Sequence, residues 1–308
     1  MENEMPPLFP KMVQIKPRKL LPKSPSLEKQ MEEEQKYLEQ LLRDKKPMIQ
    51  KQIKDAGFSC LRCGQCCERT KGDNSVFVLP KEIEKIKAFL SQNEEFKDNA
   101  FLPQNEEFKD NAFLPQNGEF KDLIVSESDF VLPLFPDYYL ENPENETISI
   151  CFDTFLDILN FLKDQIDEVG RIHTFGRMLR RKENGACFFL DESTKKCKIY
   201  EVRPGLCRTY PFYPDGAGIL ECECCGFGSA AKTNISLTAE LTDALEKRLF
   251  VELVDFKKTQ FFLKEMAAQF QLNTDDGIKK AISNLHEGFL KFVIYDGSGV
   301  FEADVSLW

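Results

Sequence analysis

Cysteines are concentrated in three short windows of this chain, and no other feature constrains its fold as strongly. Ten of the eleven cysteines fall within residues 60–67, 187–207 and 222–225. The first window places four thiols within eight residues, Cys60-Leu-Arg-Cys63-Gly-Gln-Cys66-Cys67. Ordinary buried cysteines behave as small hydrophobic residues, whereas clustered thiols at two-residue spacing can surround a soft metal ion. The sequence therefore predicts a metal-binding centre.

The compartment in which the chain works decides what these thiols can do. The N-terminus has no apolar stretch of the signal-peptide type. No run approaches the roughly 18 apolar residues of a membrane helix. We therefore expect a cytoplasmic protein without membrane contact, where clustered cysteines favour metal or redox chemistry over disulfides. The net charge of −10 argues against general nucleic-acid binding.

The chain is expected to divide into four regions. Residues 1–24 are basic and proline-rich without periodicity, which predicts a flexible tail. A helical stripe of leucines predicts a surface helix over 25–56, to which a protein partner could bind. The cysteine windows define a metal-binding domain over 57–236, into which a tandem 12-residue repeat inserts a surface loop at 92–122. A helical C-terminal region, 237–308, is expected to pack on that domain.

Helical periodicity outweighs strand periodicity along the chain. Helical spacing of apolar residues predicts helices over 153–169, 238–271 and 275–292. Short strands are expected at 76–79 and in a hairpin around 297–299. The predicted fold class is α+β, rich in helix and built around an irregular cysteine-bound centre.

The spacing of the first window indicates how many metal ions the chain holds. Cys60 and Cys63 are spaced like the two thiols of a metal knuckle. Side chains of adjacent residues diverge in an extended segment, so Cys66 and Cys67 are awkward ligands for one tetrahedral ion. We therefore expect several ions or a multinuclear cluster, with Cys67 directed away from Cys66 toward the thiols at 187–225.

Few residues other than cysteine are candidate ligands. The chain has two histidines, of which His173 is expected to be a hydrogen-bonding residue and His286 a helix residue. Cys151 lies in an apolar, strand-like run and is expected to be a buried thiol. The predicted metal ligands are the ten windowed cysteines: Cys60, Cys63, Cys66, Cys67, Cys187, Cys197, Cys207, Cys222, Cys224 and Cys225.

The cysteine windows and their neighbours resemble a known family. The segments that carry the resemblance are Phe58-x-Cys60-x-x-Cys63-Gly-x-Cys66-Cys67, Cys187-Phe-Phe-Leu190 and Cys197-x-Ile-Tyr200-x-x-Arg203-Pro204-x-x-Cys207-Arg208-x-Tyr210-Pro211. They are similar to the CxxCxxCC cysteine-cluster family, also called the YkgJ family. The stretch 173–185 resembles its archaeal branch.

The resemblance implies chelation of zinc or iron by the family's cysteines. These correspond to Cys60, Cys63, Cys66, Cys67, Cys187, Cys197 and Cys207. The extra thiols at 222–225 would supplement them. Flagellin N-methylases have a similar cluster, which implies an alternative role as an S-adenosylmethionine-dependent protein-lysine methyltransferase, or another redox enzyme built around the cluster. The absence of a Gly-x-Gly-x-x-Gly cofactor loop counts against a conventional methyltransferase fold.

Basic and aromatic residues near the thiols have two interpretations. Arg203, Arg208, Tyr200 and Tyr210 could bind an anionic substrate, although orienting the thiolate loops is the favoured role. The basic run 177–182, with Arg177, Arg180, Arg181 and Lys182, could contact an anion but is more typical of a solvated face.

The sequence thus predicts a cytoplasmic metal-binding protein that holds zinc or an iron–sulfur cluster, such as a 4Fe–4S cluster. The crowding of ten sulfurs slightly favours iron–sulfur.

Overall fold

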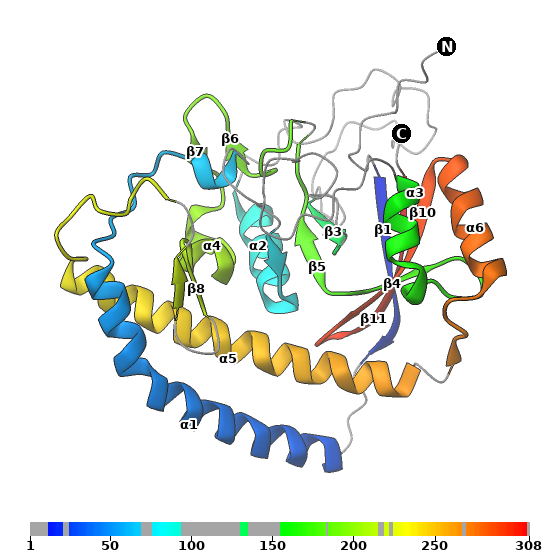
Figure 1. The fold of residues 1–308 in the computed structure, drawn as a ribbon, viewed down its shortest axis with the longest axis horizontal. Helices are drawn as coiled ribbons and strands as arrows, with labels where there is room; N and C mark the ends of the chain where they lie inside the picture. Colours follow the sequence, from blue (N-terminus) through cyan, green and yellow to red (C-terminus); the bar gives the residue numbers. More distant parts are fainter. Residues whose placement is uncertain are drawn as a thin grey trace.

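The structure is a computed structural model that describes residues 12–20, 25–68, 76–93, 130–134, 155–182, 184–214, 219–221, 224–266 and 269–306. It has the predicted α+β fold. Figure 1 shows the small elements of the cysteine region at one end of the molecule and a sheet at the other, with one long helix running beneath both.

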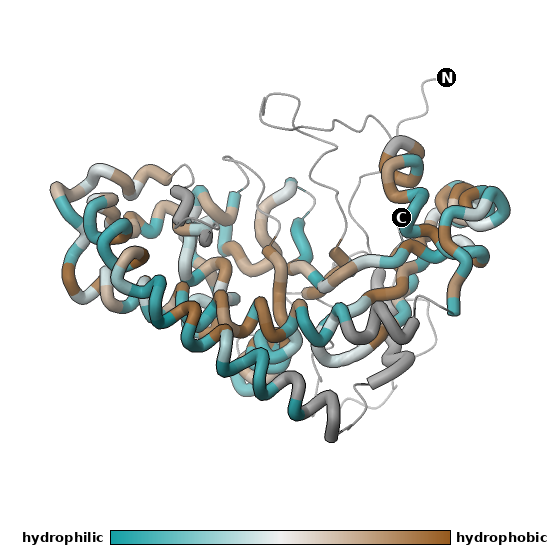
Figure 2. Tube along the Cα trace, turned by 60° about the horizontal axis from the view of Figure 1, so that its bottom comes forward, coloured by the Kyte–Doolittle hydropathy of each residue, from teal (hydrophilic) through white to brown (hydrophobic). Residues whose placement is uncertain are grey.

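Two long helices form the base of the molecule. Helix α1 (Pro25–Asp55) confirms the predicted N-terminal helix, and α5 (Ile235–Met266) occupies most of the range predicted as 238–271. Lys46 joins them, because its Nζ lies 2.8 Å from Asp243 and 2.6 Å from Glu246. Hydrophilic segments are prominent along α1, while α5 carries more hydrophobic ones (Figure 2).

The largest sheet has four strands in the order β1–β11–β10–β4. Strands β10 (Phe289–Asp296) and β11 (Gly299–Ser306) form the predicted hairpin around 297–299, and β4 (Ile172–Phe175) pairs with β10 in parallel. The expected flexible tail is wrong for β1 (Met12–Leu20), which pairs antiparallel with β11 along its length. Backbone pairing with β11 makes this segment the outer strand of the sheet.

Two predicted helices are shorter than their apolar spacing indicates. Helix α6 (Asp275–His286) ends before Gly288, which has a φ of +86°, and residues 289–292 of the predicted helix belong instead to β10. The helix expected over 153–169 comprises α3 (Phe155–Phe161) and the 3-10 turn η6 (Lys163–Gln165). Ile158 of α3 and Leu285 of α6 pack into one core cluster with Phe292 and Ile294 of β10.

A second, three-stranded sheet lies between the two ends of the molecule in the order β2–β5–β3. Strand β2 (Phe77–Val78) confirms the strand predicted at 76–79 and leads into helix α2 (Pro80–Gln92). Its partners are β5 (Arg177–Leu179) and β3 (Val131–Pro133). This sheet carries the chain from the first cysteine window toward the second.

The cysteine region is built from very short elements. They are η1 (Gln65–Cys67), β6 (Leu190–Asp191), β7 (Lys196–Cys197), η7 (Tyr200–Val202), α4 (Gly205–Thr209), β8 (Phe212–Pro214) and β9 (Ile219–Glu221). The predicted repeat loop lies outside the described residues from residue 94 onward. Among the described helices, none combines the length and apolarity required to cross a membrane.

Candidate metal centre

The first cysteine window is held in shape by two glycines in the left-handed region. Gly57 (φ +63°) follows α1, and a Cβ there would lie 2.3 Å from the carbonyl oxygen of Ala230. Gly64 (φ +77°) precedes η1 and packs against the backbone of Lys195. Both positions therefore need glycine, and each brings the window against a later segment of the chain.

The expected divergence of Cys66 and Cys67 is wrong. Both lie on η1, and their Sγ atoms are 3.9 Å apart because the 3-10 turn curls the two side chains toward one side. Two ligands of a tetrahedral zinc ion, each about 2.3 Å from the metal, are separated by about 3.8 Å. The adjacent thiols therefore fit neighbouring corners of one tetrahedral site.

The backbone of Cys67 contacts the second cysteine window. The backbone N–H of Cys187 donates to the carbonyl oxygen of Cys67 at 2.8 Å. Cys187 then leads into the β6–β7 pair, in which Leu190 lies opposite Cys197. Cys66, Cys67, Cys187, Cys197 and Cys207, called here the inner group, thus come together from three segments of the chain.

Cys207 reaches the inner group on helix α4, which two side chains hold in place. Glu82 of α2 accepts hydrogen bonds from the backbone N–H groups of Leu79 (3.0 Å) and Gly205 (2.7 Å). Arg248 of α5 donates to Thr209 at 2.7 Å. Arg208, a predicted candidate for anion binding, instead donates to the carbonyl oxygens of Arg203 (3.0 Å) and Glu201 (2.6 Å), so it braces the loop.

A second set of thiols gathers where the first window meets the third. The Sγ atoms of Cys63 and Cys225 are 3.2 Å apart, although 162 positions separate them in the sequence. Burial raises the pKa of Cys224, and the charges of Cys60, Cys63 and Cys66 raise it further. Cys60, Cys63, Cys224 and Cys225 are called here the outer group. These contacts confirm that the early and late cysteine windows are interleaved in space.

Three of the inner thiols are surrounded by apolar side chains. Burial, which outweighs the other influences, raises the pKa of Cys187 to about 11 and also raises the pKa values of Cys197 and Cys207. The contact with Cys67 lowers the pKa of Cys66 to about 7 and raises that of Cys67. The buried thiols are therefore neutral unless a cation stabilises their thiolate form.

A cavity of about 400 Å³ lies among these thiols. All five inner thiols and Cys60 line it, with basic and aromatic side chains that include Arg62, Lys195, Arg203, Tyr200, Tyr210 and Tyr213. The guanidinium carbons of Arg203 and Arg62 lie 4.1 and 5.2 Å from the centre of the Tyr200 ring. Arg62 and Tyr213 were not predicted as residues of the site, although Arg62 lies within the Cys60-x-x-Cys63 spacing itself.

The arrangement of the thiols stops short of a closed ligand shell. Within the described ranges, no set of three or more His, Cys, Asp or Glu side chains stands close enough together to hold an ion. The soft donors are nevertheless the type that zinc and iron–sulfur clusters use. The predicted ligand Cys222 and the predicted buried thiol Cys151 lie outside the described residues.

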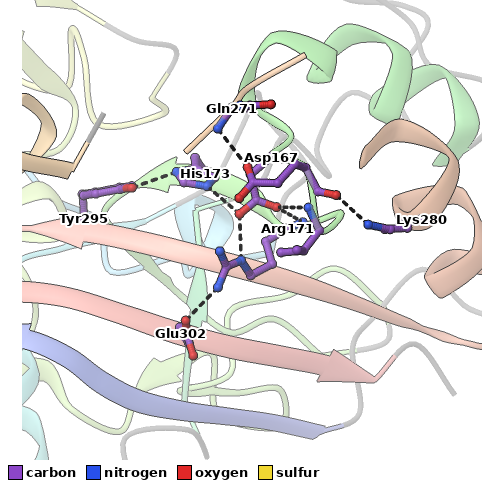
Figure 3. Close-up of polar contacts among 9 residues, drawn as sticks. Asp167, Arg171, His173, Gln271, Lys280, Tyr295 and Glu302 are labelled. Carbon is purple, nitrogen blue, oxygen red and sulfur yellow. Dashed lines mark hydrogen bonds and ion pairs between the residues drawn. The ribbon is translucent and has the colours of Figure 1, made fainter. Parts of the chain in front are cut away.

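His173 is a buried hydrogen-bonding residue in a separate network (Figure 3). Its Nδ1 lies 2.8 Å from the Tyr295 hydroxyl, and its Nε2 lies 3.1 Å from Oδ2 of Asp167. Arg171 donates to the same carboxylate at 2.7 Å and to Glu302 at 2.9 Å. The network joins the 166–171 turn to the four-stranded sheet and explains why His173 has no thiol partner here.

The basic run 177–182 is not the solvated face that its composition predicts. Arg177 and Arg181 are buried, with 3% and 5% of their surfaces exposed. Arg177 pairs with the buried Asp296 at 2.5 Å, and Lys182 donates to Glu192 at 2.8 Å. Within this run, the Arg177–Asp296 pair therefore neutralises a charge inside the fold, whereas Lys182 pairs with a carboxylate at the surface.

Comparison with known proteins supports metal binding for part of the chain. Residues 157–226 match the model of the CxxCxxCC family, described as "Putative zinc- or iron-chelating domain". The uncharacterized protein MJ0661 of Methanocaldococcus jannaschii is 48% identical over 59 residues. That alignment covers 18% of this chain and 32% of the relative, so the chain spans about a third of its length. No solved structure matches the chain.

The family match includes the second and third cysteine windows and leaves 60–67 outside it. It supports a metal-binding role through chelation of zinc or iron. The resemblance to archaeal members and to flagellin N-methylases stays a prediction.

Proposed function

We propose that the inner group holds zinc or an iron–sulfur cluster, with the cluster favoured. The observation that carries this proposal is the convergence of five thiols from three chain segments on one cavity of about 400 Å³. Four thiolates complete either a tetrahedral zinc site or the ligand set of a cluster. The cavity is larger than a single ion needs, and this size favours the cluster.

The surroundings of the inner group suit an anionic metal–thiolate centre. Burial keeps Cys187, Cys197 and Cys207 neutral in the absence of a cation, so a bound metal would convert them to thiolates and release protons. The positive charge of Arg203 partly opposes the rise that burial causes in the pKa of Cys197, adds to the lowering that the Cys67 contact causes in the pKa of Cys66, and would offset the negative charge of the loaded centre. When bound, zinc would stabilise the fold, whereas a cluster would also accept or donate single electrons.

Anaerobic purification with elemental analysis and an absorption spectrum tests this proposal. Iron and sulfide with a broad visible band would indicate a cluster, and a colourless protein with zinc would indicate zinc. Cys187→Ser should lose the metal, whereas Cys151→Ser, at a cysteine outside the windows, should keep it. A Cys187→Ser protein that remains folded with an unchanged metal content would contradict the assignment.

The cavity also favours a second candidate function. Its volume falls within the roughly 300–1,000 Å³ range of small-molecule sites, and Tyr200, Tyr210 and Tyr213 provide apolar surface beside the thiols. An S-adenosylmethionine-dependent protein-lysine methyltransferase would bind its cofactor there. Isothermal titration of the anaerobic protein with S-adenosylmethionine tests this function, and a titration without binding heat would remove it.

A further inference from the structure

The cavity beside the inner group is basic, although the chain as a whole is acidic. Its lining among the described residues includes Arg62, Lys195, Lys196 and Arg203 and contains no aspartate or glutamate. The whole chain has a net charge of −10, so this concave surface has the opposite sign to the rest of the molecule. A cleft lined by charges of one sign concentrates small ions of the other sign from solution. The cavity therefore favours an anionic ligand.

Three of these four cations are available to a ligand. Lys195 forms an ion pair with Glu68. Among the residues that the structure describes, no carboxylate pairs with Arg62, Lys196 or Arg203. Arg203 is half-buried, whereas Arg62 and Lys196 are exposed, so a ligand that enters the cavity from solution can reach them. Even if the charge of Arg203 is used to offset the loaded thiol centre, two cations remain for the ligand.

Two arginines from different segments of the chain converge on the ring of Tyr200. Stacking on an aromatic ring leaves the N–H donors of a guanidinium at its edge, where their fork fits the oxygens of a carboxylate or phosphate. Within the described part of the chain, the guanidinium groups of Arg62 and Arg203 donate no hydrogen bond. Arg208 differs from them, because its donors are bound to the carbonyl oxygens of Arg203 and Glu201. Tyr200 therefore holds two forks in place without using their donors.

The backbone of Arg62 has a conformation that arginine rarely adopts. Its φ of +51° lies in the left-handed region, which glycine and asparagine tolerate far better. Residues in this region persist where the surrounding fold holds them, and they concentrate at ligand sites. Glycine or asparagine would relieve the strain at this position, so the side chain of Arg62 at the cavity, rather than its backbone, accounts for the arginine.

We propose that the cavity binds a small organic anion beside the thiol centre, with its phosphate or carboxylate group held by Arg62 and Arg203. The apolar part of the ligand lies against Tyr210 and Tyr213, which line the same cavity. The cavity volume of about 400 Å³ suits a ligand of metabolite size. The inference deepens the proposed function by naming a ligand class for the same cavity, and it rests on that function only for the metal beside the ligand.

Isothermal titration of the anaerobically purified full chain with phenyl phosphate and with benzoate tests the inference. The two probes join the same ring to a phosphate or to a carboxylate, and neither is a strong metal chelator. Benzamide is the neutral analogue. At low ionic strength at least one of the anions should bind, and benzamide should bind at least about tenfold more weakly. The anion that binds more tightly identifies the group that the arginines prefer.

Variants of the two arginines locate the site. Arg62→Gln should weaken binding of the preferred anion by about tenfold or more, the loss expected for charge-assisted hydrogen bonds, and should keep the metal. Arg203→Lys keeps the positive charge but lacks the fork, and it should also weaken anion binding and keep the metal. Arg43→Gln removes an equal charge from an exposed position of α1 outside the cavity lining, and it should bind the anion like the unaltered chain.

Metal content, measured on every sample, separates this inference from the proposed function. The inference is overturned if the unaltered chain binds neither anion, or binds benzamide as tightly as the anions. It is also overturned if either arginine variant, folded by circular dichroism, binds the anion as tightly as the unaltered chain. Loss of the metal together with the anion in Arg62→Gln would overturn it too, because the arginine would then act through the thiols. A chain purified without metal that binds the anion only when Arg62 is present would contradict the proposed function and support this inference.

Discussion

Asp255 of α5 accepts a hydrogen bond at its Oδ1 atom from the backbone N–H of Gly297, at 3.0 Å. This contact fastens the long helix to the turn between β10 and β11. The buried Asp296 is adjacent in sequence to Gly297 and is paired with Arg177 at 2.5 Å. Two carboxylates and one guanidinium therefore share the place where helix and sheet meet.

Replacing Asp255 with asparagine should stabilise the protein at neutral pH. Burial, followed by the charge of Asp296, raises the pKa of Asp255 to about 6, against weaker opposing effects of the Gly297 hydrogen bond, Lys258 and Arg177. An acid with a raised pKa contributes stability that is fully present below pH 4 and is lost as the pH rises through about 6. Asp255→Asn keeps the acceptor for Gly297 and should raise the free energy of unfolding at pH 7 by on the order of 2 kcal/mol.

Chemical denaturation between pH 4 and pH 7 measures this effect. The stability gain of Asp255→Asn should shrink toward zero at pH 4, where the native carboxyl is protonated. Asp243→Asn on the same helix is the control, because its exposed pair with Lys46 should contribute less than about 1 kcal/mol. A gain independent of pH would mean that the asparagine acts through something other than charge.

Gly297→Ala should destabilise the same junction. A Cβ at this position would lie 2.1 Å from Oδ1 of Asp255, so the helix and the turn must move apart. Overpacking of this kind destabilises by roughly 1–3 kcal/mol. Denaturation of Gly297→Ala in the Asp255→Ala background should show a smaller loss, since the clashing oxygen is gone; equal losses in both backgrounds would refute the clash.

Strand β10 is a segment for which helical periodicity predicts the wrong secondary structure. Phe289 and Phe292 continue the helical spacing of the preceding residues, which is why a helix to residue 292 is predicted. Gly288, at φ +86°, ends the helix, and the alternation of the following residues is satisfied by pairing with β11. Phe289 and Phe292 are three positions apart, which fits a helix, whereas Leu290, Phe292 and Ile294 are two apart and form the buried face of β10. Local spacing could not separate these two outcomes, because the same short apolar run contains both patterns.

The sequence predicts which cysteines gather in the thiol centre, but not which of them lie next to one another. The prediction that the first cysteine window lies close to the later windows is confirmed. It followed from the need of soft metal ions for several thiols together. The sequence could not show that Cys66 and Cys67 share a side, since that follows from the 3-10 turn after Gly64. Nor could it divide the thiols into groups, because backbone contacts such as that between Ser59 and Gly226 join segments far apart in sequence.

Asp167→Asn should strongly destabilise the end of the molecule that carries the four-stranded sheet. Burial, the largest single influence, favours a higher pKa for Asp167, but hydrogen bonds from His173 and Arg171 outweigh it and lower the pKa to about 2. An acid with a lowered pKa contributes stability that is present above pH 4 and is lost as the pH falls through about 2. Breaking such a buried pair costs about 3–5 kcal/mol.

Urea denaturation from pH 7 down to pH 2 measures the contribution of Asp167. The difference between the native chain and Asp167→Asn should narrow as the native carboxylate becomes protonated. Glu302→Gln is the control, because Glu302 pairs with the same Arg171 from a side chain that is 46% exposed and should contribute less than about 1 kcal/mol. A loss for Glu302→Gln as large as that for Asp167→Asn would contradict the role of burial.

Gly226→Ala should separate the two segments that carry the outer thiols. A Cβ there would lie 2.4 Å from the Ser59 carbonyl oxygen and 2.8 Å from the Phe58 ring, so the backbone contact between Ser59 and Gly226 must break. The expected loss is roughly 1–3 kcal/mol. Gly228→Ala in the same turn is the matched variant. A Cβ at Gly228 has open space around it, so the only cost to stability is the backbone strain of alanine at a φ of +67°.

The two alanine variants should therefore differ both in how much stability they lose and in whether the outer thiols stay close together. Gly228→Ala should lose about 1 kcal/mol from backbone strain alone and leave the spacing of Cys63 and Cys225 intact. Gly226→Ala should also slow the cross-linking of these two thiols by a short bifunctional maleimide, measured by mass spectrometry of the digested protein. Equal stability and equal cross-linking in both variants would show that the close approach of Gly226 to Ser59 does not hold the outer thiols together.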